Sequence, residues 1–554
     1  MEDTFDITLG DLLDKQAKRY PENDAVIYRE KGSRYSYQEF NSICKLAARA
    51  FMKLGINPGD HLAIWAENQP EWLITQFATG KMGAVLVTVN TNYRAMELEY
   101  LLKHSDAQTL ILSKGIRTSF PNILYKICPE LRNSRPGELR SRNLPHLRNV
   151  IYIGEEEAPA GMFHWEDVLE AGLEVSNEEL QERQQELKPD DVINMQYTSG
   201  TTGFPKGVML THNNIINNGS RIGRCMNLSS SDRLCIPVPF FHCFGCVLGN
   251  MACVTSGATM VPLLRFRAEE VLKTIEEESC TGVHGVPTMF IAELEHPDFD
   301  KYDLSSLRTG IMAGSPCPVE IMKKVINDMG ATEITIAYGL TEASPVITQT
   351  RTDDPLEKRV NTAGKALPGV ELKIVDPESG EELNYGEQGE LCTRGFHVMK
   401  GYYKMSEETR EVIESDGWLH TGDLAIMEKD GYVRITGRLN DMIIRGGENI
   451  YPREVEEFFY KHPAIKDIQV VGIPDEKYGE EVMAYIQLKN GCDLRPGEIF
   501  DYFKDRISWH KLPKKIEIVD EFPLTASGKV QKYKLREKAI EKHDLQYVKE
   551  IETA

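Results

Sequence analysis

Short apolar runs alternate with amphipathic stretches along the first hundred residues. Residues 25–28, 61–66 and 83–89 are aliphatic or β-branched runs of the length and composition typical of buried strands. Ser36 and Glu39 stand three residues apart ahead of a helix-periodic stretch, which predicts a capping box. Strands that alternate with helices in this way predict an α/β fold with a mostly parallel sheet covered by helices.

Length and composition set further bounds. A chain of 554 residues is too long for one compact core, so two or more domains are expected. The net charge of −21 argues against nucleic acid as the main partner. No window of about 18 apolar residues predicts a membrane span, and the first residues contain neither a basic leader nor an apolar segment. A cytoplasmic location is therefore predicted.

The cysteines point the same way. There are 11 of them, scattered along the chain, which favours reduced thiols over a disulfide framework. Cys243 and Cys246 have the Cys-x-x-Cys spacing, but no further metal ligands stand nearby. We interpret this pair as small apolar side chains in a core.

Residues 197–208 contain the most distinctive chemistry. Four hydroxyl residues (Thr198, Ser199, Thr201 and Thr202), three glycines that include Gly200, and Lys206 follow a short predicted strand at 192–196. Glycines let successive N–H groups converge on one anion, and Lys206 adds a positive charge. The stretch predicts a loop that holds a polyphosphate, although the spacing is not that of the nucleotide-binding P-loop. The alternative is a solvated turn between strands.

Two later stretches offer groups suited to a nucleotide. In residues 336–342, Tyr338 presents a ring that can stack on adenine, Thr341 a hydroxyl donor, and Glu342 a hard oxygen ligand for Mg²⁺. Asp423 ends residues 417–423 with a carboxylate that can accept both ribose hydroxyls. The alternatives are a strand followed by a helix cap at the first site and a plain turn at the second.

Other features carry weaker signals. His242 stands among aromatic residues in 237–245, where a lone histidine is usually a core residue. Residues 286–289 and 311–316 each join an apolar strand to a tight turn. Eight basic residues and only two acidic ones lie within residues 114–148. A solvated insertion explains that excess better than a patch for CoA or a lipid head group, so we assign no site there.

Taken together and in order, these motifs resemble those of the adenylate-forming superfamily, with further matches at residues 437–450 and 523–530. The superfamily includes acyl-CoA synthetases, peptide-synthetase adenylation domains and beetle luciferases. The resemblance runs from about residue 7 to 540. It implies a large N-terminal domain of layered β-sheets and helices (1–437), a hinge (438–441) and a small, mobile α+β C-terminal domain (442–554). The pivot residue is Asn440, where the family commonly has Asp or Lys, so no charge-based role is carried over to it.

The resemblance also implies roles for individual residues. The ATP or AMP ligands would be Thr198, Ser199, Gly200, Thr201, Thr202, Lys206, Gly314, Ser315, Tyr338, Gly339, Thr341, Asp423, Arg438 and Lys529. Catalysis would fall to Lys529, Thr341, Glu342 and His242, with Mg²⁺ on Glu342. CoA would pass Arg445, Gly446 and Gly447, and the acyl pocket would be lined by His242, His284, Val286, Gly310 and Met312.

The function implied is that of an AMP-forming acyl-CoA ligase that uses ATP, Mg²⁺ and CoA. Residues 445–452 look like those of bacterial fatty-acyl-CoA ligases and of medium-chain acyl-CoA synthetases of animals. Medium-chain, cyclic and aromatic acids all stay open as substrates, and a homo-oligomer is compatible with the sequence. The alternatives are an enzyme with another acceptor, such as a carrier protein, a luciferase-like oxygenase, and a non-catalytic nucleotide-binding protein.

Overall fold

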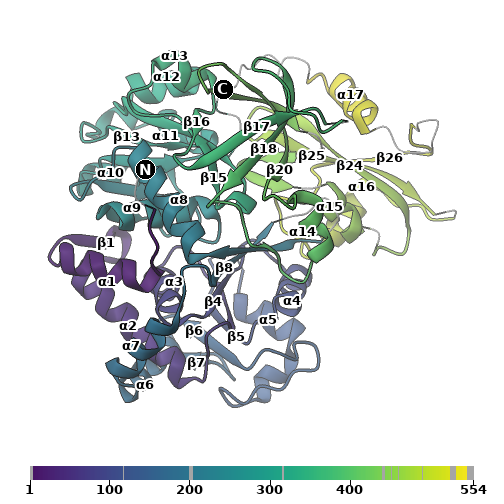
Figure 1. Cartoon of the computed structure of the whole chain (residues 1–554). Coiled ribbons are helices and arrows are strands. Elements are labelled where there is room, and N and C mark those ends of the chain that lie inside the picture. The colour runs from purple at the N-terminus through teal and green to yellow at the C-terminus, as the bar shows by residue number, and fades with distance from the viewer. Residues whose placement is uncertain are drawn as a thin grey trace.

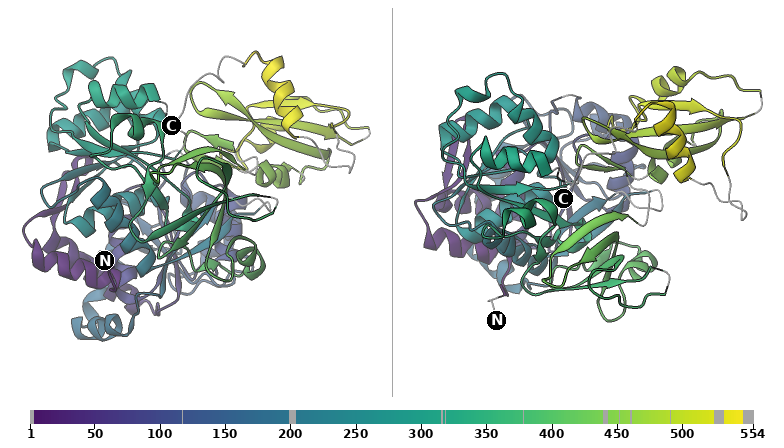
Figure 2. Two further views of the ribbon diagram at one scale, coloured as in Figure 1. Left: turned by 45° about the horizontal axis from the view of Figure 1, so that its top comes forward. Right: turned by 90° about the horizontal axis from the view of Figure 1, so that it is seen from above.

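The computed structural model describes residues 4–116, 118–198, 204–314, 317, 319–377, 379–438, 443–450, 452–459, 461–489, 491–523 and 532–545. They form a large N-terminal part and a smaller C-terminal part (Figure 1). Figure 2 shows the C-terminal part, coloured yellow-green to yellow, projecting from one side of the larger body. The predicted α/β fold of two unequal parts is confirmed.

One large sheet is parallel in its centre and antiparallel at both edges. Its order among the described residues is β16 (Lys365–Ala366), β15 (Val346–Gln349), β14 (Glu333–Gly339), β13 (Thr309–Met312), β12 (Gly282–Gly285), β10 (Arg233–Ile236), β11 (Thr259–Pro262), β1 (Asp24–Tyr28) and β2 (Ser33–Ser36). The helices between its strands are α8 (His212–Cys225), α9 (Asn250–Ser256), α10 (Ala268–Glu278), α11 (Pro287–Leu294), α12 (Val319–Asn327) and α13 (Leu356–Asn361).

A second sheet contains the strands predicted from residues 61–66 and 83–89, which pair in parallel as β3 and β4. Its order is β19 (Gly401–Tyr402), β9 (Lys206–Thr211), β8 (Val192–Thr198), β4 (Val85–Thr88), β3 (His61–Trp65), β5 (Thr109–Ser113), β6 (Asn149–Ile153) and β7 (Phe163–His164). The helices of this region are α1 (Leu9–Arg19), α2 (Tyr37–Lys53), α3 (Pro70–Met82), α4 (Ala95–His104), α5 (Phe120–Ile127), α6 (Trp165–Ala171) and α7 (Asn177–Glu186). The predicted capping box of Ser36 and Glu39 opens α2.

The main hydrophobic core fills the space between these two sheets. Leu62 and Ile64 of β3 and Leu234 and Ile236 of β10 belong to the same buried cluster. Helix α3 runs through it with apolar side chains on every face, which is the pattern of a helix surrounded by protein. Even Lys81 of α3 is fully buried. The two sheets therefore form one rigid body, and their strand ends can share a site.

A smaller antiparallel sheet completes the N-terminal part. Its strands are β17 (Val370–Val375), β18 (Gln388–Gly395), β20 (Leu419–Met427) and β21 (Val433–Arg438), with α14 (Ser406–Val412) inserted between β19 and β20.

The C-terminal part is a sheet with helices against it. Its elements are β22 (Ile443–Arg445), β23 (Glu448–Ile450), α15 (Pro452–Phe459), β24 (Ile465–Asp475), β25 (Gly479–Leu488), α16 (Pro496–Phe503), β26 (Lys515–Ile518) and α17 (Lys532–Lys542). Strands β24 and β25 are longer than the apolar runs at 468–472 and 483–486 predict. They pair from Ile465 opposite Leu488 to Asp475 opposite Gly479. Polar residues extend the hairpin because their partners lie elsewhere in this part, as with Glu481 and Arg445.

The basic stretch at 114–148 is a packed insertion. Its leucines, Leu131, Leu139, Leu144 and Leu147, belong to the core of the second sheet, while the described lysines and arginines in it are exposed. Among the helices that the structure describes, none is both long and apolar enough to cross a membrane.

Several histidines are buried in uncharged form. Burial lowers the pKa of His212 and of His284 to about 4, and that of His397 to about 3. Each makes a hydrogen bond suited to a neutral ring. The Leu9 N–H donates to His212 Nδ1 at 3.0 Å, His284 Nε2 lies 3.1 Å from the Leu248 carbonyl oxygen, and His397 Nε2 lies 2.8 Å from the Thr393 hydroxyl oxygen. Between pH of about 6.5 and about 4, the unfolded chain therefore binds more protons than the folded one.

We expect the free energy of unfolding to fall as the pH drops through this window, by about 2 kcal/mol per buried imidazole at pH 5. Denaturant midpoints at pH 7.5 and pH 5 measure the fall. His212→Asn keeps an acceptor for the Leu9 N–H and should make the fall smaller, whereas His146→Asn, at a site with a 55% exposed side chain, should leave it unchanged. A midpoint that holds or rises at pH 5 in the wild type would contradict the assignment.

Candidate nucleotide and acyl site

The carboxylate of Glu342 lies where the two large sheets meet. Strand β14 ends at Gly339, and a short 3-10 helix, Thr341–Ala343, follows it. Glu342 Oε1 accepts a hydrogen bond from the Tyr402 hydroxyl at 2.8 Å and one from the Thr198 hydroxyl at 3.4 Å. Thr198 and Tyr402 belong to the second sheet, so one acidic side chain connects strand ends from both.

The predicted phosphate loop is framed by the hairpin of β8 and β9. Thr198 pairs with Lys206 at the end of this hairpin. The Lys206 side chain is buried, and its Nζ lies 4.7 Å from the centre of the Tyr402 ring. Tyr402 thus receives a cation on its face and donates its hydroxyl to Glu342. Ser199, Gly200, Thr201 and Thr202 lie outside the described residues, so their phosphate role stays a prediction.

Two residues predicted to hold the nucleoside are in direct contact. The Tyr338 hydroxyl donates to Asp423 Oδ2 at 2.7 Å, which joins β14 to β20 of the smaller sheet. The Thr421 hydroxyl accepts the Asp423 N–H at 3.1 Å. The predicted adenine and ribose ligands therefore lie side by side. Tyr338 and Gly339 end β14, the strand that leads directly to Glu342.

A histidine between two carboxylates supports the segment of β20 that contains Asp423. His420 Nδ1 lies 2.9 Å from Glu390 Oε2, and its Nε2 lies 2.7 Å from Glu414 Oε1. Hydrogen bonds to Cys392, Glu390 and Glu414 raise the pKa of His420 to about 11, which makes it an imidazolium. The other oxygen of Glu390 accepts the Gly422 N–H at 2.9 Å. Glu390, Cys392 and His420 have the ligand types of a metal site, yet both ring nitrogens already face carboxylates, which favours a structural brace next to Asp423.

His242 is held in neutral form. Burial lowers its pKa to about 4, and its Nδ1 accepts the Phe244 N–H at 3.2 Å. The neighbouring thiols, Cys243 and Cys246, are buried as predicted, but both contact a polar side chain, that of Gln196. Cys243 donates to the Gln196 side-chain oxygen at 2.9 Å, and the Gln196 amide lies 3.1 Å from Cys246 Sγ. A π-helical turn follows at Phe244–Gly249, a geometry that is frequent at functional sites.

The predicted acyl-pocket residues divide between two faces of the first sheet. His284 on β12 packs its ring 5.4 Å from that of Phe244. Met312 on β13 belongs instead to the cluster on the opposite face, and its neighbour Ile311 belongs to the main core with Phe244 and Val286. Side chains alternate between the two faces along a strand, so Ile311 and Met312, which are neighbours in the chain, lie on opposite faces of the sheet. The structure thus brings Ile311 next to the other candidates in place of Met312.

Gly310 and Gly314 flank Ile311 in a backbone that needs glycine. Gly310 has φ +147°, and a Cβ there would lie 1.9 Å from the Val283 carbonyl oxygen. Gly314 has φ +90°, and a Cβ there would lie 3.1 Å from Val286 Cγ1. Both positions bring backbone close to the predicted pocket.

The predicted CoA residues come from the C-terminal part and reach the same place. Gly446 and Gly447 form the turn between β22 and β23, with φ of +59° and +83°. A Cβ on Gly447 would lie 2.8 Å from Val286 Cγ1, so the turn packs directly on a candidate acyl-pocket residue. Arg445 points away from it: its guanidinium pairs with Glu481 at 2.7 Å and is largely buried.

Thr341, a predicted phosphate ligand, is buried next to Glu342 in the chain.

Some predicted residues cannot be placed. Ser315, Asn440 and Lys529 lie outside the described residues, and the structure gives the backbone of Arg438, which pairs with Asp423, but not its side chain. Tyr402, Glu390 and His420 are the site residues that sequence analysis missed. His420 stands in the same motif as Asp423, so that motif contained a usable signal, whereas nothing local marks Tyr402 or Glu390.

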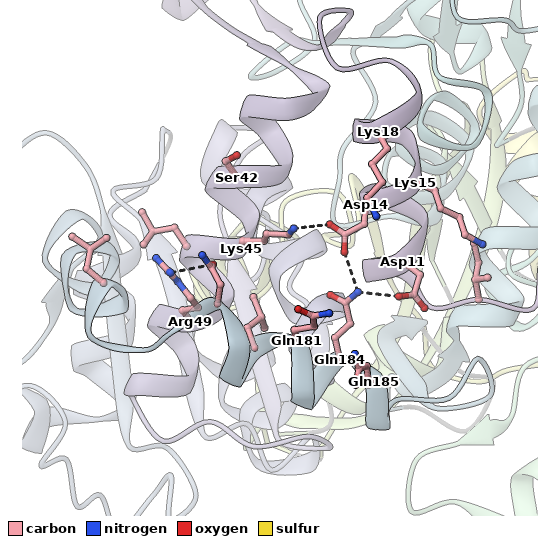
Figure 3. Close-up of a pocket in the computed structure, with 15 residues that line it drawn as sticks. Asp11, Asp14, Lys15, Lys18, Ser42, Lys45, Arg49, Gln181, Gln184 and Gln185 are labelled. Carbon is pink, nitrogen blue, oxygen red and sulfur yellow. Dashed lines mark hydrogen bonds and ion pairs between the residues drawn. The ribbon is translucent and has the colours of Figure 1, made fainter.

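A groove of about 910 Å³ opens elsewhere, between α1, α2 and α7 (Figure 3). It is lined by basic, acidic and amide side chains that bind one another. Asp14 accepts from Lys45 at 2.9 Å and from Gln184 at 3.0 Å. Lys81 beneath it pairs with Asp14 as well. None of the predicted site residues that the structure describes lines this groove, and its polar groups hold the three helices together.

Comparison with known proteins agrees with this arrangement. A family model described as AMP-binding enzyme matches residues 13–403, and one described as AMP-binding enzyme C-terminal domain matches residues 454–529. YngI of Bacillus subtilis (strain 168), whose name gives it as an acyl-CoA synthetase, is 60% identical over 546 residues, which cover 98% of this chain and 99% of YngI. The medium-chain acyl-CoA ligase ACSF2, mitochondrial, of Danio rerio is 42% identical, over 96% of this chain and 88% of the relative.

Solved structures give the same result. The o-succinylbenzoate CoA synthetase MenE from Bacillus subtilis has a TM-score of 0.77 at 27% identity, over 95% of this chain and 97% of that one. A fatty acyl CoA synthetase from Mycobacterium tuberculosis has a TM-score of 0.67 at 27% identity, over 96% and 98%. The resemblance inferred from the motifs is confirmed: the chain belongs to the family of AMP-binding enzymes.

Proposed function

We propose that this protein is an AMP-forming acyl-CoA ligase, which converts a carboxylic acid, ATP and CoA to acyl-CoA, AMP and pyrophosphate. The observation that carries the proposal is a convergence of three parts of the chain. Tyr338, which bonds Asp423, packs against the buried cluster that contains the candidate acyl-pocket residue Val286, and the Gly446–Gly447 turn packs on Val286 as well. An adenylate former that delivers its product to CoA needs these three components in one place.

The first step would be attack of the substrate carboxylate oxygen on the α-phosphorus of ATP. A new oxygen–phosphorus bond forms, the bond to pyrophosphate breaks, and an acyl-adenylate results. Such a transfer depends on positioning and charge stabilisation more than on covalent catalysis. Lys206 and the residues of the 198–206 loop would hold the leaving pyrophosphate, Thr341 would donate to phosphate oxygen, and Lys529 would neutralise charge on the α-phosphate and carboxylate.

The donor set around Glu342 fits a magnesium ion. A carboxylate and two hydroxyl groups, from Thr198 and Tyr402, meet at the edge of the predicted phosphate loop. Mg²⁺ prefers hard oxygen ligands of this kind and usually shares them with phosphates. When bound, it would neutralise developing negative charge on the phosphates. Glu342 is the residue proposed to hold it.

The second step would be attack of the CoA sulfur on the acyl carbon. The carbon–sulfur bond forms, the carbon–oxygen bond to AMP breaks, and the thiol proton leaves to solvent. Glycine at 446 and 447 would let the pantetheine arm pass close to backbone, because a side chain at 447 would collide with Val286. Rotation of the C-terminal part about Asn440 would bring Lys529 and this turn to the site in succession.

The acid proposed is a medium-chain fatty acid. The candidate pocket is apolar, since Val286, Ile311 and Phe244 belong to one buried cluster. The neutral ring of His284 closes it without a charge. A relative at 42% identity is named a medium-chain acyl-CoA ligase, which supports this size class. A cytoplasmic location is part of the same proposal.

The function is tested by AMP and thioester formation with ATP, Mg²⁺ and CoA over acids from acetate to palmitate, with benzoate and cyclohexane carboxylate included. We expect a sharp optimum among the medium chains. An optimum at a ring acid would overturn the proposed substrate class and leave the reaction intact. Pyrophosphate exchange without any thioester would overturn CoA as the acceptor and favour a carrier protein or an oxygenase-like reaction.

Removing the charge of Glu342 should impair the first step. We expect Glu342→Gln to lower the rate of pyrophosphate exchange by about two orders of magnitude, as for loss of one group that stabilises transition-state charge. The Mg²⁺ concentration for half-maximal rate should rise in parallel. Glu357→Gln, an exposed position on α13, is the matched control. If Glu342→Gln catalyses pyrophosphate exchange at the control's rate and with the control's Mg²⁺ dependence, the role proposed for Glu342 is wrong.

Removing Lys529 should separate the two steps. We expect Lys529→Ala to abolish pyrophosphate exchange but to retain thioester formation from preformed acyl-AMP, because the lysine acts on the α-phosphate only before adenylate forms. Lys538→Ala on α17, where the lysine is largely exposed, is the control. Equal loss of both half-reactions would contradict the role proposed for Lys529.

A further inference from the structure

A buried polar cluster joins the N-terminal part to the C-terminal part at the start of α4. Glu97 of α4 accepts a hydrogen bond from the Ser508 hydroxyl at 2.6 Å, and Lys511 Nζ lies 3.4 Å from the same oxygen. Lys511 also pairs with Glu454 of α15 at 2.6 Å. The side chains of Glu97 and Glu454 are fully buried and that of Lys511 is 4% exposed. Charged groups this deep are rare unless they are paired.

Glu97 is prepared for this contact by its place in α4. Its Oε2 accepts the backbone N–H of Arg94, the residue that precedes the helix, at 2.9 Å. Its Oε1 is the atom that faces Ser508 and Lys511. One oxygen therefore fixes the side chain on the N-terminal part, while the other binds the C-terminal part. The carboxylate loses little conformational freedom on docking, because its rotamer is already set.

Neighbouring residues complete the contact. Lys511 Nζ lies 5.0 Å from the centre of the Tyr93 ring, and Trp509 Nε1 donates to Asn92 Oδ1 at 3.2 Å. Met96 packs on the hydrophobic core of the C-terminal part. Burial lowers the pKa of Lys511, but Glu454, Tyr93 and Glu97 outweigh it, and the net shift is upward. The lysine stays charged in a site that excludes water.

The same loop supports the glycine turn. The carbonyls of Trp509 and His510 accept from the Arg445 guanidinium at 3.1 and 2.8 Å. Arg445 is also fixed by Glu481, and it immediately precedes Gly446 and Gly447. A continuous path of contacts therefore runs from Glu97 through loop 508–511 and Arg445 to the turn on Val286. Position at one end of this path sets position at the other.

We propose that Glu97 is a positioning residue for thioester formation: by holding Ser508 and Lys511 it fixes the Gly446–Gly447 turn at the acyl pocket. The inference rests on the proposed function, since it assigns this arrangement of the two parts to the CoA step. Glu97 acts from the edge of the domain contact and touches no predicted substrate ligand among the described residues. Loss of Glu97 should therefore slow thioester formation, the step in which Glu97 contacts Ser508 and Lys511. It should not slow adenylation, for which the C-terminal part would be rotated so that Lys529 reaches the site.

The test compares Glu97→Gln with Glu99→Gln in the full chain. Glutamine keeps the size of the side chain and an oxygen for the Arg94 N–H, so that hydrogen bond stays while the charge is lost. Glu99 lies on the same helix, is partly exposed and forms an ion pair with Lys103 of that helix. Two rates are measured for each variant: pyrophosphate exchange, and thioester formation from preformed acyl-AMP and CoA.

We expect Glu97→Gln to slow the thioester step by about tenfold or more, the range for removing one partner of a buried charge pair. Exchange should remain at the wild-type rate, and Glu99→Gln should match the wild type in both. Ser508→Ala should slow the same step. The double variant should be no slower than Glu97→Gln alone, because the two residues act as one contact.

Three outcomes would overturn the inference. They are a thioester rate for Glu97→Gln equal to that of Glu99→Gln, an equal loss of both half-reactions, and independent, additive effects of Glu97→Gln and Ser508→Ala. A failure of the proposed function looks different, because the wild type itself would then form no thioester with CoA.

Discussion

The site depends on one constraint: a single carboxylate has to be reached from strands of two separate sheets. Glu342 follows strand β14 of the first sheet, while Thr198 and Tyr402 come from β8 and β19 of the second. This is only achieved because a shared core holds the sheets in a fixed relation. The main hydrophobic core is therefore not separate from the function. It determines the distances at which the polar groups of the site meet.

The second organising feature is the use of paired charges at boundaries, partly exposed around His420 and buried around Lys511. Placing ions inside a protein costs several kcal/mol each before pairing, so such groups are retained only where their partners are well placed. His420 lies between Glu390 and Glu414 on β20, the strand that contains Asp423. Lys511 lies between Glu97 and Glu454 where the two parts of the chain meet. Both clusters fix the backbone next to a predicted substrate ligand. Their hydrogen bonds and ion pairs require one specific geometry, which apolar packing alone does not.

Much of the fold follows from local sequence signals. The parallel strands β3 and β4 and the capping box at Ser36 are determined by neighbours in the chain, so periodicity and spacing are enough to predict them. The motif residues Tyr338 and Asp423 were identified from their chemistry, and they lie in contact. The full length of β24 and β25 was not predicted, because their outer residues are polar and depend on partners such as Arg445.

The rest of the site depends on tertiary contacts that the sequence pattern does not show. Met312 and Ile311 are both apolar, and only the alternation of the strand decides which one faces His284. Tyr402 stands in a two-residue strand with no motif of its own, and Glu97 lies 411 residues from Ser508. Contacts of such sequence separation are set by packing of whole domains, which no local pattern reveals.

The central claim is that a carboxylate attacks the α-phosphorus of ATP at this site. The most direct measurement uses the best acid substrate labelled with ¹⁸O in its carboxyl group, with AMP and pyrophosphate analysed by mass spectrometry. The account predicts one labelled oxygen in AMP, since the oxygen that attacks phosphorus stays with AMP when the thioester forms. Label in pyrophosphate, or none in AMP during thioester synthesis, would contradict it.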